Sequence, residues 1–206
     1  MTGLRERKKL QTRQHIADVA ARLFAEHGFE DVTVDQVAMA ADVAKKTVFN
    51  YFPTKEDLVF DRAEERELDL IALVRDRPAG TSTIAAFRAK TMLFLSRIAE
   101  RPPDFQRGSV IELTRDSPAL QRKGLEIQET QARLLAKELA AASGQPDWDP
   151  LANAMARTLL AANRAVFMEV HRQLHVGATP REAAEIARPA AERIYDQLER
   201  GLADFG

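Results

Sequence analysis

Apolar residues recur along this chain with the period of an α-helix. In residues 5–27, the apolar positions Ile16, Ala20, Leu23 and Phe24 lie three or four residues apart, which places them on one face of a helix. Similar spacing continues through the rest of the sequence, where Gly, Pro and capping residues separate one helical segment from the next. The pattern therefore predicts an all-α protein.

Side chains that can cap unpaired backbone groups mark where the helices begin. Ser, Thr or Asp accepts hydrogen bonds from the first amides of a helix, and Pro suits its first position. Thr33 with Gln36, and Thr54 with Asp57, have the spacing of a capping box. Together with Gly and Pro stop signals, these caps predict about nine helices, over residues 5–27, 34–40, 44–51, 55–77, 82–100, 104–115, 118–143, 150–176 and 180–204.

Composition narrows the class of protein. The 206 residues are 45% hydrophobic but only 6% aromatic, which favours helices and allows one large domain, or a small domain joined to a larger one. The chain has no cysteine, which excludes disulfides and thiolate metal sites and fits a reducing compartment. Neither a signal peptide nor an uncharged apolar run of about 18 residues is present. We therefore expect a cytoplasmic protein that does not associate with a membrane.

The two short helices within residues 34–52 have the pattern of a helix-turn-helix. They are joined at Ala41-Asp42-Val43, and Val48 and Phe52 are placed to pack inward against the first helix. The remaining positions of the third helix then face outward. Lysines there could neutralise phosphates or reach guanine, Thr and Asn could form hydrogen bonds, and an aromatic ring could contact a thymine methyl group. These outward positions are Lys45, Lys46, Thr47, Phe49 and Asn50.

The stretch TRQHIADVAARLFAEHGFEDVTVDQVAMAADVAKKTVFNYFPTKEDL, residues 12–58, resembles the DNA-binding domain of the TetR family of transcriptional regulators. The shared features are a first helix ending at Gly28-Phe29, a second helix opened by Thr33, an aromatic-rich third helix, and Lys55 before an acidic-Leu segment. The rest of the chain resembles the family only in the number and length of its helices. The resemblance implies a helix-turn-helix DNA-binding domain over 1–54 and a larger effector-binding and dimerisation domain over 55–206.

By this resemblance the protein would be a homodimeric repressor that binds a palindromic operator in double-stranded DNA and is released by a small-molecule effector. The resemblance places Lys45, Lys46, Thr47, Phe49 and Asn50 in the major groove. It places Thr33, Tyr51 and Lys55 on the phosphate backbone.

Two residues depart from the family pattern. Asp42 stands in the turn where the family usually has Gly, and we expect an intact turn because Asp tolerates left-handed backbone angles. Phe49 stands where many members have Tyr, so only an apolar contact is expected from its ring.

The resemblance also implies that the last two helices pair with their symmetry mates. Apolar rows on these helices fit such a four-helix bundle, but they fit equally well burial in the core of the monomer. The rows are Leu159, Leu160, Phe167 and Val170 on one helix, and Ile186, Ile194, Leu198 and Leu202 on the other.

A small-molecule pocket is implied within the helices between residues 55 and 176. Asn163 and Arg164 interrupt the apolar run TLLAANRAVFM, and a polar group buried there would need a partner from the ligand or the protein. For Arg164 this partner would be an anionic ligand or an acidic side chain. Candidate lining residues are Phe87, Met92, Phe94, Phe105, Trp148, Asn163, Arg164, Phe167, Met168 and His171.

Charge alone does not identify a DNA-binding domain here. Residues 1–60 contain nine Lys and Arg and nine Asp and Glu, whereas basic domains are the usual electrostatic signal. The cations do gather in an N-terminal arm, where Arg5, Arg7, Lys8, Lys9 and Arg13 stand against Glu6. Such an arm could contact a phosphate or the minor groove, or could be a solvated tail.

Enzyme motifs are absent from the sequence. It contains no G-x-G-x-x-G, P-loop or G-x-S-x-G pattern, so we expect neither enzymatic activity nor a cofactor. The pair His171 and His175 has the spacing of two metal ligands on a helix, but Arg172 stands where a zinc hydrolase has its Glu base, and no third ligand is evident. A metal-dependent hydrolase using this pair, and a non-regulatory DNA-binding scaffold, remain the alternatives.

Overall fold

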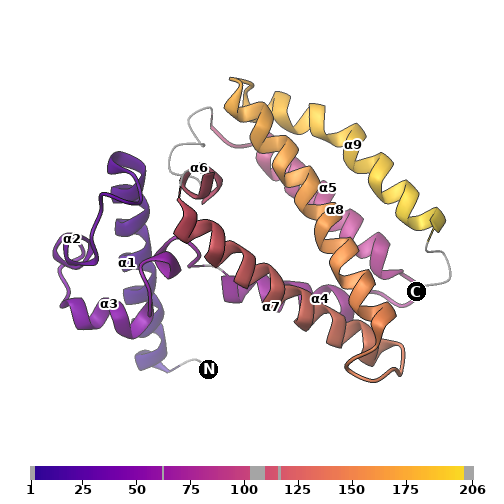
Figure 1. The fold of residues 1–206 in the computed structure, drawn as a ribbon, viewed down its shortest axis with the longest axis horizontal. Helices are drawn as coiled ribbons and strands as arrows, with labels where there is room; N and C mark the ends of the chain where they lie inside the picture. The colour runs from indigo at the N-terminus through magenta and orange to yellow at the C-terminus, as the bar shows by residue number, and fades with distance from the viewer. Residues whose placement is uncertain (1–2, 62, 103–109, 116, 202–206) are drawn as a thin grey trace. The chain divides into compact units, whose positions relative to one another are not determined.

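The computed structural model describes residues 3–61, 63–102, 110–115 and 117–201. Over these residues the chain is all-helical, as predicted (Figure 1). Its elements are α1 (Leu4–His27), α2 (Val34–Ala40), α3 (Lys45–Tyr51), the 3-10 helix η1 (Glu56–Leu58), α4 (Ala63–Arg75), α5 (Thr83–Ala99), α6 (Val110–Arg115), α7 (Pro118–Ala142), α8 (Pro150–His175) and α9 (Pro180–Gly201). None of the helices in the described ranges is long and apolar enough to span a membrane.

The capping signals located most helix boundaries correctly. The side chains of Thr33, Ser117 and Asp149 accept hydrogen bonds from amides in the first turns of α2, α7 and α8, at 3.2, 3.3 and 2.7 Å. Thr179 forms the same kind of cap with Glu182 before α9. Of the predicted helix over 104–115, residues 104–109 lie outside the described residues, and α6 accounts for the remainder.

The prediction of one helix over residues 55–77 is wrong. The structure forms η1, then a turn, and begins α4 only at Ala63. Leu58 and Val59 are buried in the core of the N-terminal unit, and the Arg13 guanidinium donates a 2.8 Å hydrogen bond to the carbonyl of Asp61. These contacts with α1 hold the backbone in a turn, and local helical periodicity carries no information about them.

The chain divides into two compact units, one formed by residues 1–64 with 106–126 and the other by residues 65–105 with 127–206. The first two turns of α7 therefore belong to the same unit as the helix-turn-helix. The functional division after residue 54 stays a prediction.

The N-terminal unit is built around the inward-facing residues of the helix-turn-helix. Ile16, Phe24, Val48 and Phe52 are all 1% exposed or less, which confirms the predicted direction of these side chains. Leu120 of α7 is fully buried in the same core, so a residue distant in sequence completes it. This packing fixes which side of α3 can face solvent.

In the second unit, α5, α8 and α9 lie side by side (Figure 1). A buried polar network joins the three helices. The Thr91 hydroxyl donates to the carbonyl of Phe87 at 3.0 Å, receives a 3.2 Å hydrogen bond from the Asn163 amide, and lies 2.8 Å from the Tyr195 hydroxyl. Burial raises the pKa of Tyr195, an effect opposed by its hydrogen bonds with Thr91 and Asn163. The network satisfies these polar groups inside an otherwise apolar core.

Candidate nucleic-acid interface

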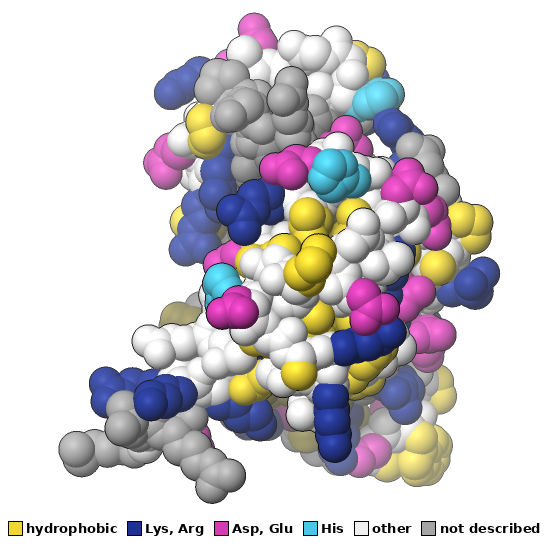
Figure 2. Space-filling model, turned by 90° about the vertical axis from the view of Figure 1, so that its left-hand side faces the viewer, with side chains coloured by type: hydrophobic (Ala, Val, Ile, Leu, Met, Phe, Trp, Pro, Cys, Tyr) yellow, Lys and Arg dark blue, Asp and Glu magenta, His cyan; other side chains and the backbone are white. Residues whose placement is uncertain are grey.

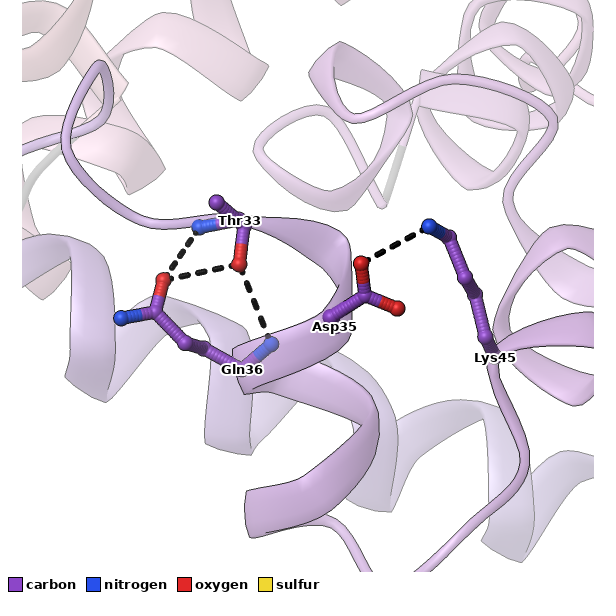
Figure 3. A network of polar contacts seen from close by, with 4 residues as sticks. All are labelled: Thr33, Asp35, Gln36 and Lys45. Atoms are coloured by element: carbon purple, nitrogen blue, oxygen red, sulfur yellow. Dashed lines mark hydrogen bonds and ion pairs between the residues drawn. The ribbon is translucent and has the colours of Figure 1, made fainter.

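The second helix of the helix-turn-helix begins with a complete capping box (Figure 3). The Thr33 hydroxyl accepts a hydrogen bond from the Gln36 amide at 3.2 Å, and the Gln36 side chain accepts from the Thr33 amide at 2.7 Å. This reciprocal pair satisfies two backbone donors at the start of α2. The cap fixes where α2 starts, although α2 is only seven residues long.

The turn between α2 and α3 depends on Asp42, which has φ 52°. Across the described residues it is the one non-glycine position with a positive φ. The Val43 amide donates to the Ala38 carbonyl at 3.0 Å, and a His15 ring nitrogen lies 3.2 Å from the Ala41 carbonyl. The prediction that Asp replaces Gly without loss of the turn is confirmed.

The outer face of α3 carries the side chains predicted for the major groove. Lys45, Lys46 and Asn50 are exposed, Phe49 is 41% exposed, and Thr47 is half-buried. They are presented outward because Val48, on the opposite side of the helix, is fully buried. The structure thus brings a cationic, polar and aromatic set onto one short helix. Their contacts with DNA stay a prediction.

Lys45 has a protein partner on the second helix. Its ammonium lies 2.8 Å from a carboxylate oxygen of Asp35 (Figure 3). The two side chains are 52% and 66% exposed, so the pair lies at the surface of the helix-turn-helix. Sequence reasoning missed Asp35, because its distance from Lys45 depends on the angle between α2 and α3. The sequence shows only that Asp35 lies in the first turn of α2. An acidic residue at that position is also explained by its favourable interaction with the helix dipole.

The three residues predicted to hold phosphates are already engaged within the protein. The Thr33 hydroxyl takes part in the capping box, and Tyr51 is half-buried against the core. The Lys55 ammonium donates to the Glu30 carbonyl at 3.2 Å and lies 4.2 Å from the centre of the Phe29 ring. Partial burial lowers the pKa of Lys55, while nearby acids oppose that effect. A phosphate would have to share or replace these partners.

The N-terminal arm is part of a helix, since α1 already begins at Leu4. Arg13 is not available as one of its free cations, because its guanidinium binds the Asp61 carbonyl and lies 4.8 Å from the centre of the Phe52 ring.

Figure 2 shows basic, acidic and hydrophobic side chains interspersed over the side of the molecule that it draws. This mixture agrees with the balanced charge of residues 1–60.

Residues 16–61 match the family model described as bacterial regulatory proteins, tetR family. The chain is also 28% identical over 197 residues to the HTH-type transcriptional regulator TcmR of Streptomyces glaucescens, covering 92% of this chain and 84% of TcmR. The chain is therefore similar to TetR-family regulators, most clearly over residues 16–61.

Solved structures of the same fold cover most of the chain. Salmonella enterica GusR has a TM-score of 0.58 at 22% identity, with 92% of this chain and 94% of GusR covered. FadR of Bacillus subtilis in complex with stearoyl-CoA has a TM-score of 0.52 at 19% identity, with coverage of 88% and 97%. These likenesses show the fold of the chain, which is an N-terminal helix-turn-helix followed by a larger helical C-terminal part.

The residues predicted to line an effector pocket do not lie in one place. Phe87 is fully buried, whereas Arg164 and Met168 are exposed on α8. Trp148 is 78% exposed in the turn before α8, whereas Phe167 lies about 26 Å along α8 from its first residue, Pro150. Phe105 lies outside the described residues. These positions leave Trp148 and Arg164 as surface residues of the described monomer.

Part of the predicted set does form one cluster. The ring centres of Phe94 and Phe167 are 5.6 Å apart, and those of Phe167 and His171 are 4.6 Å apart in an edge contact. Met92 and Phe94 both pack against the buried core formed by α5, α8 and α9, and the Met92 sulfur lies 3.8 Å from the Arg188 guanidinium. Asn163 joins the neighbouring polar network through Thr91. This aromatic cluster is the part of the predicted site that the fold assembles.

His171 contributes a buried polar side chain to the aromatic cluster. It is 7% exposed, and its Nδ1 has no hydrogen-bond partner in the part of the chain that the structure describes. Burial lowers the pKa of His171 to about 4. His175 is exposed, and the described residues contain no group of three or more His, Cys, Asp or Glu that could hold a metal ion. The structure therefore gives no support to the metal-dependent hydrolase.

We expect His171 to make the stability of this protein fall in mild acid. Because its pKa falls from 6.5 to about 4 on folding, the unfolded chain binds the extra proton between these pH values. Stability from neutral His171 is present above pH 6.5 and is lost as the pH falls, by about 2 kcal/mol at pH 5. Urea unfolding at pH 7 and pH 5 should show a smaller loss in His171→Leu than in the wild type. Equal losses in the two proteins would contradict the burial of His171.

Proposed function

We propose that this chain is a homodimeric repressor of the TetR family that binds a palindromic operator through α3 and releases it when a small molecule occupies the C-terminal unit. The observation that carries the proposal is the exposed face of α3 with Lys45, Lys46, Phe49 and Asn50, held outward by the buried Val48. Lysine and asparagine can donate hydrogen bonds to guanine and adenine, and the ring can contact a thymine methyl group. As a regulator of bacterial DNA it would act in the cytoplasm.

Two copies of the chain are proposed because α3 has only seven residues. So short a helix reads few base pairs, and a two-fold dimer reads two half-sites related by the same symmetry. The last two helices remain the proposed contact, but α8 would use a different face from the one predicted. Leu159 and Val170 are fully buried, and Leu160, Ile194 and Leu198 pack against the core of their own monomer. Leu202 lies outside the described residues.

Small and apolar side chains instead form an exposed seam along α8. Its members alternate at spacings of three and four residues, which is the pattern of a helix that packs along a partner helix. All of them are exposed in the monomer. The seam consists of Leu151, Ala154, Thr158, Ala161, Ala165 and Met168. Ile186 of α9 is also 49% exposed and provides a second apolar contact.

A charged residue in the middle of the α8 seam should prevent dimerisation. We expect Ala161→Arg to shift the mass measured by light scattering from dimer to monomer, because the guanidinium could not be buried against a partner without an acid nearby. Ala142→Arg, at an exposed position near the end of α7, is the matched control and should remain dimeric. A dimeric Ala161→Arg protein would remove α8 from the interface.

An effector is proposed from the C-terminal unit and from its relatives. The aromatic cluster with His171 offers apolar surface beside a ring nitrogen, Nδ1, that has no hydrogen-bond partner among the described residues. The structural relative FadR was solved with stearoyl-CoA, which illustrates a ligand held by this fold. The effector proposed for this chain is an unidentified small molecule with a largely apolar surface.

Selection of random duplex DNA by the purified protein tests the operator proposal. Recovery of a palindrome, bound by one dimer, is the expected result. Binding that does not depend on sequence would instead favour a non-regulatory scaffold, since phosphate contacts alone carry no sequence information. The selected duplex then serves in a competition screen for compounds that release it.

A further inference from the structure

Asp35 places a negative charge on the surface proposed to meet DNA. It lies in the first turn of α2, and its carboxylate is 2.8 Å from the ammonium of Lys45 at the start of α3 (Figure 3). The capping box at Thr33 fixes the start of α2, and the turn at Asp42 fixes its direction relative to α3. The pair is therefore a product of the helix-turn-helix geometry.

Stability does not explain this pair. Both side chains are more than half exposed, and an exposed ion pair contributes little to folding because water and salt screen it. The carboxylate of Asp35 has a larger effect on the binding of a polyanion such as DNA than on folding. A carboxylate next to Lys45 cancels the positive charge that a phosphate would otherwise attract, and Lys46 is left as the neighbouring cation of α3.

We propose that Asp35 is a positioning residue that determines specificity: it holds the Lys45 ammonium at the edge of the α2–α3 surface and lowers the affinity for unrelated DNA more than the affinity for the operator. The inference rests on the proposed operator-binding function of α3.

The donor geometry of lysine explains why the operator complex is less affected. An ammonium group has three N–H donors, so Lys45 can keep one on Asp35 and direct the other two toward a base edge or a nearby phosphate. Without Asp35, the flexible stem lets the ammonium reach whichever phosphate is near, in any register. Phosphate contacts carry no sequence information, so freeing Lys45 favours unrelated sequences.

The test compares binding of the selected operator and of a scrambled duplex over a range of salt concentrations. For the scrambled duplex, Asp35→Asn should raise affinity roughly eightfold in 0.1 M salt and steepen the dependence of log K on log salt by about 0.9, the effect of one additional phosphate contact. The gain for the operator should be several times smaller, so that the ratio of the two affinities falls.

A second substitution isolates the contribution of Lys45. Lys45→Gln should change the salt dependence on scrambled DNA only slightly in the wild-type background, and by about 0.9 in the Asp35→Asn background. Glu100→Gln, which makes the same charge change in the other unit, should leave the salt dependence unchanged. Thermal melting of each variant verifies that it is folded.

The outcomes separate this inference from the proposed function. If the wild type selects an operator but Asp35→Asn binds scrambled DNA with unchanged affinity and salt dependence, the role of Asp35 is overturned. An equal gain on both duplexes would also overturn it, because the specificity ratio would be preserved. If the wild type selects no sequence, the operator-binding function itself fails.

Discussion

Replacing Lys46 and Asn50 together by alanine is expected to lower the affinity for the selected operator at least about 30-fold, because each base contact contributes about 1–3 kcal/mol of discrimination. The two residues are exposed four positions apart on α3, so they lie on the same side of the helix. Neither is buried in the core, and the melting temperature should stay close to that of the wild type.

Competition binding against scrambled duplex measures both the affinity for the operator and the preference for the operator over scrambled DNA. The double variant should lose affinity for the operator and also much of its preference over scrambled DNA, since Asn50 can read a base and Lys46 can read a base or a phosphate. Lys137→Ala removes an exposed lysine from α7 and should change neither. Retention of full operator affinity by the double variant would show that α3 does not read the DNA.

The second large effect is expected from Phe52→Ala, which should destabilise the protein by about 3–5 kcal/mol. Phe52 is 1% exposed at the end of α3, and its ring also contacts the guanidinium of Arg13. Truncation leaves a cavity in a core shared with α1, and it removes a surface that fixes the direction of α3. Urea unfolding followed by circular dichroism measures the loss.

Phe49→Ala is the matched control for Phe52→Ala. Phe49 is on the same helix but is 41% exposed, so its truncation should cost less than about 1 kcal/mol of stability. Its effect is expected in operator binding, where an apolar contact with a thymine methyl group is lost. Similar destabilisation by the two substitutions would contradict the assigned orientation of α3.

Local signals were enough to predict the helix-turn-helix. The capping box of Thr33 with Gln36 lies within one turn, and Val48 and Phe52 are spaced by one turn on the inner face. The left-handed backbone at Asp42 is likewise a property of a single residue and its neighbours. Because each of these features involves only nearby residues, the sequence contains the information that sets them.

Contacts between distant segments decided what the sequence could not predict. The break after η1 depends on Arg13 binding the Asp61 carbonyl, 48 residues away. The Lys55 ammonium turns toward the Glu30 carbonyl and the Phe29 ring. In both cases a side chain has several partners of suitable chemistry in the sequence, and only the folded chain shows which of them lies within reach.

The apolar rows of the last two helices are another feature whose partners the sequence could not predict. Periodicity fitted both a dimer interface and a monomer core, and the structure buries Leu159 and Val170 in the monomer while exposing the α8 seam around Ala161. Small residues such as Ala carry little hydrophobic signal, so the exposed seam was not visible as a stripe.

The sequence by itself determined the all-α class, the helix-turn-helix and the outward face of α3, because caps, turns and helical periodicity act over a few residues. The tertiary structure alone decided the pairing of Asp35 with Lys45, the burial of His171 beside Phe167, and the joining of α7 to the N-terminal core. Those features depend on how helices pack against one another, which is set by the shape of the whole core and not by the pattern of any one helix.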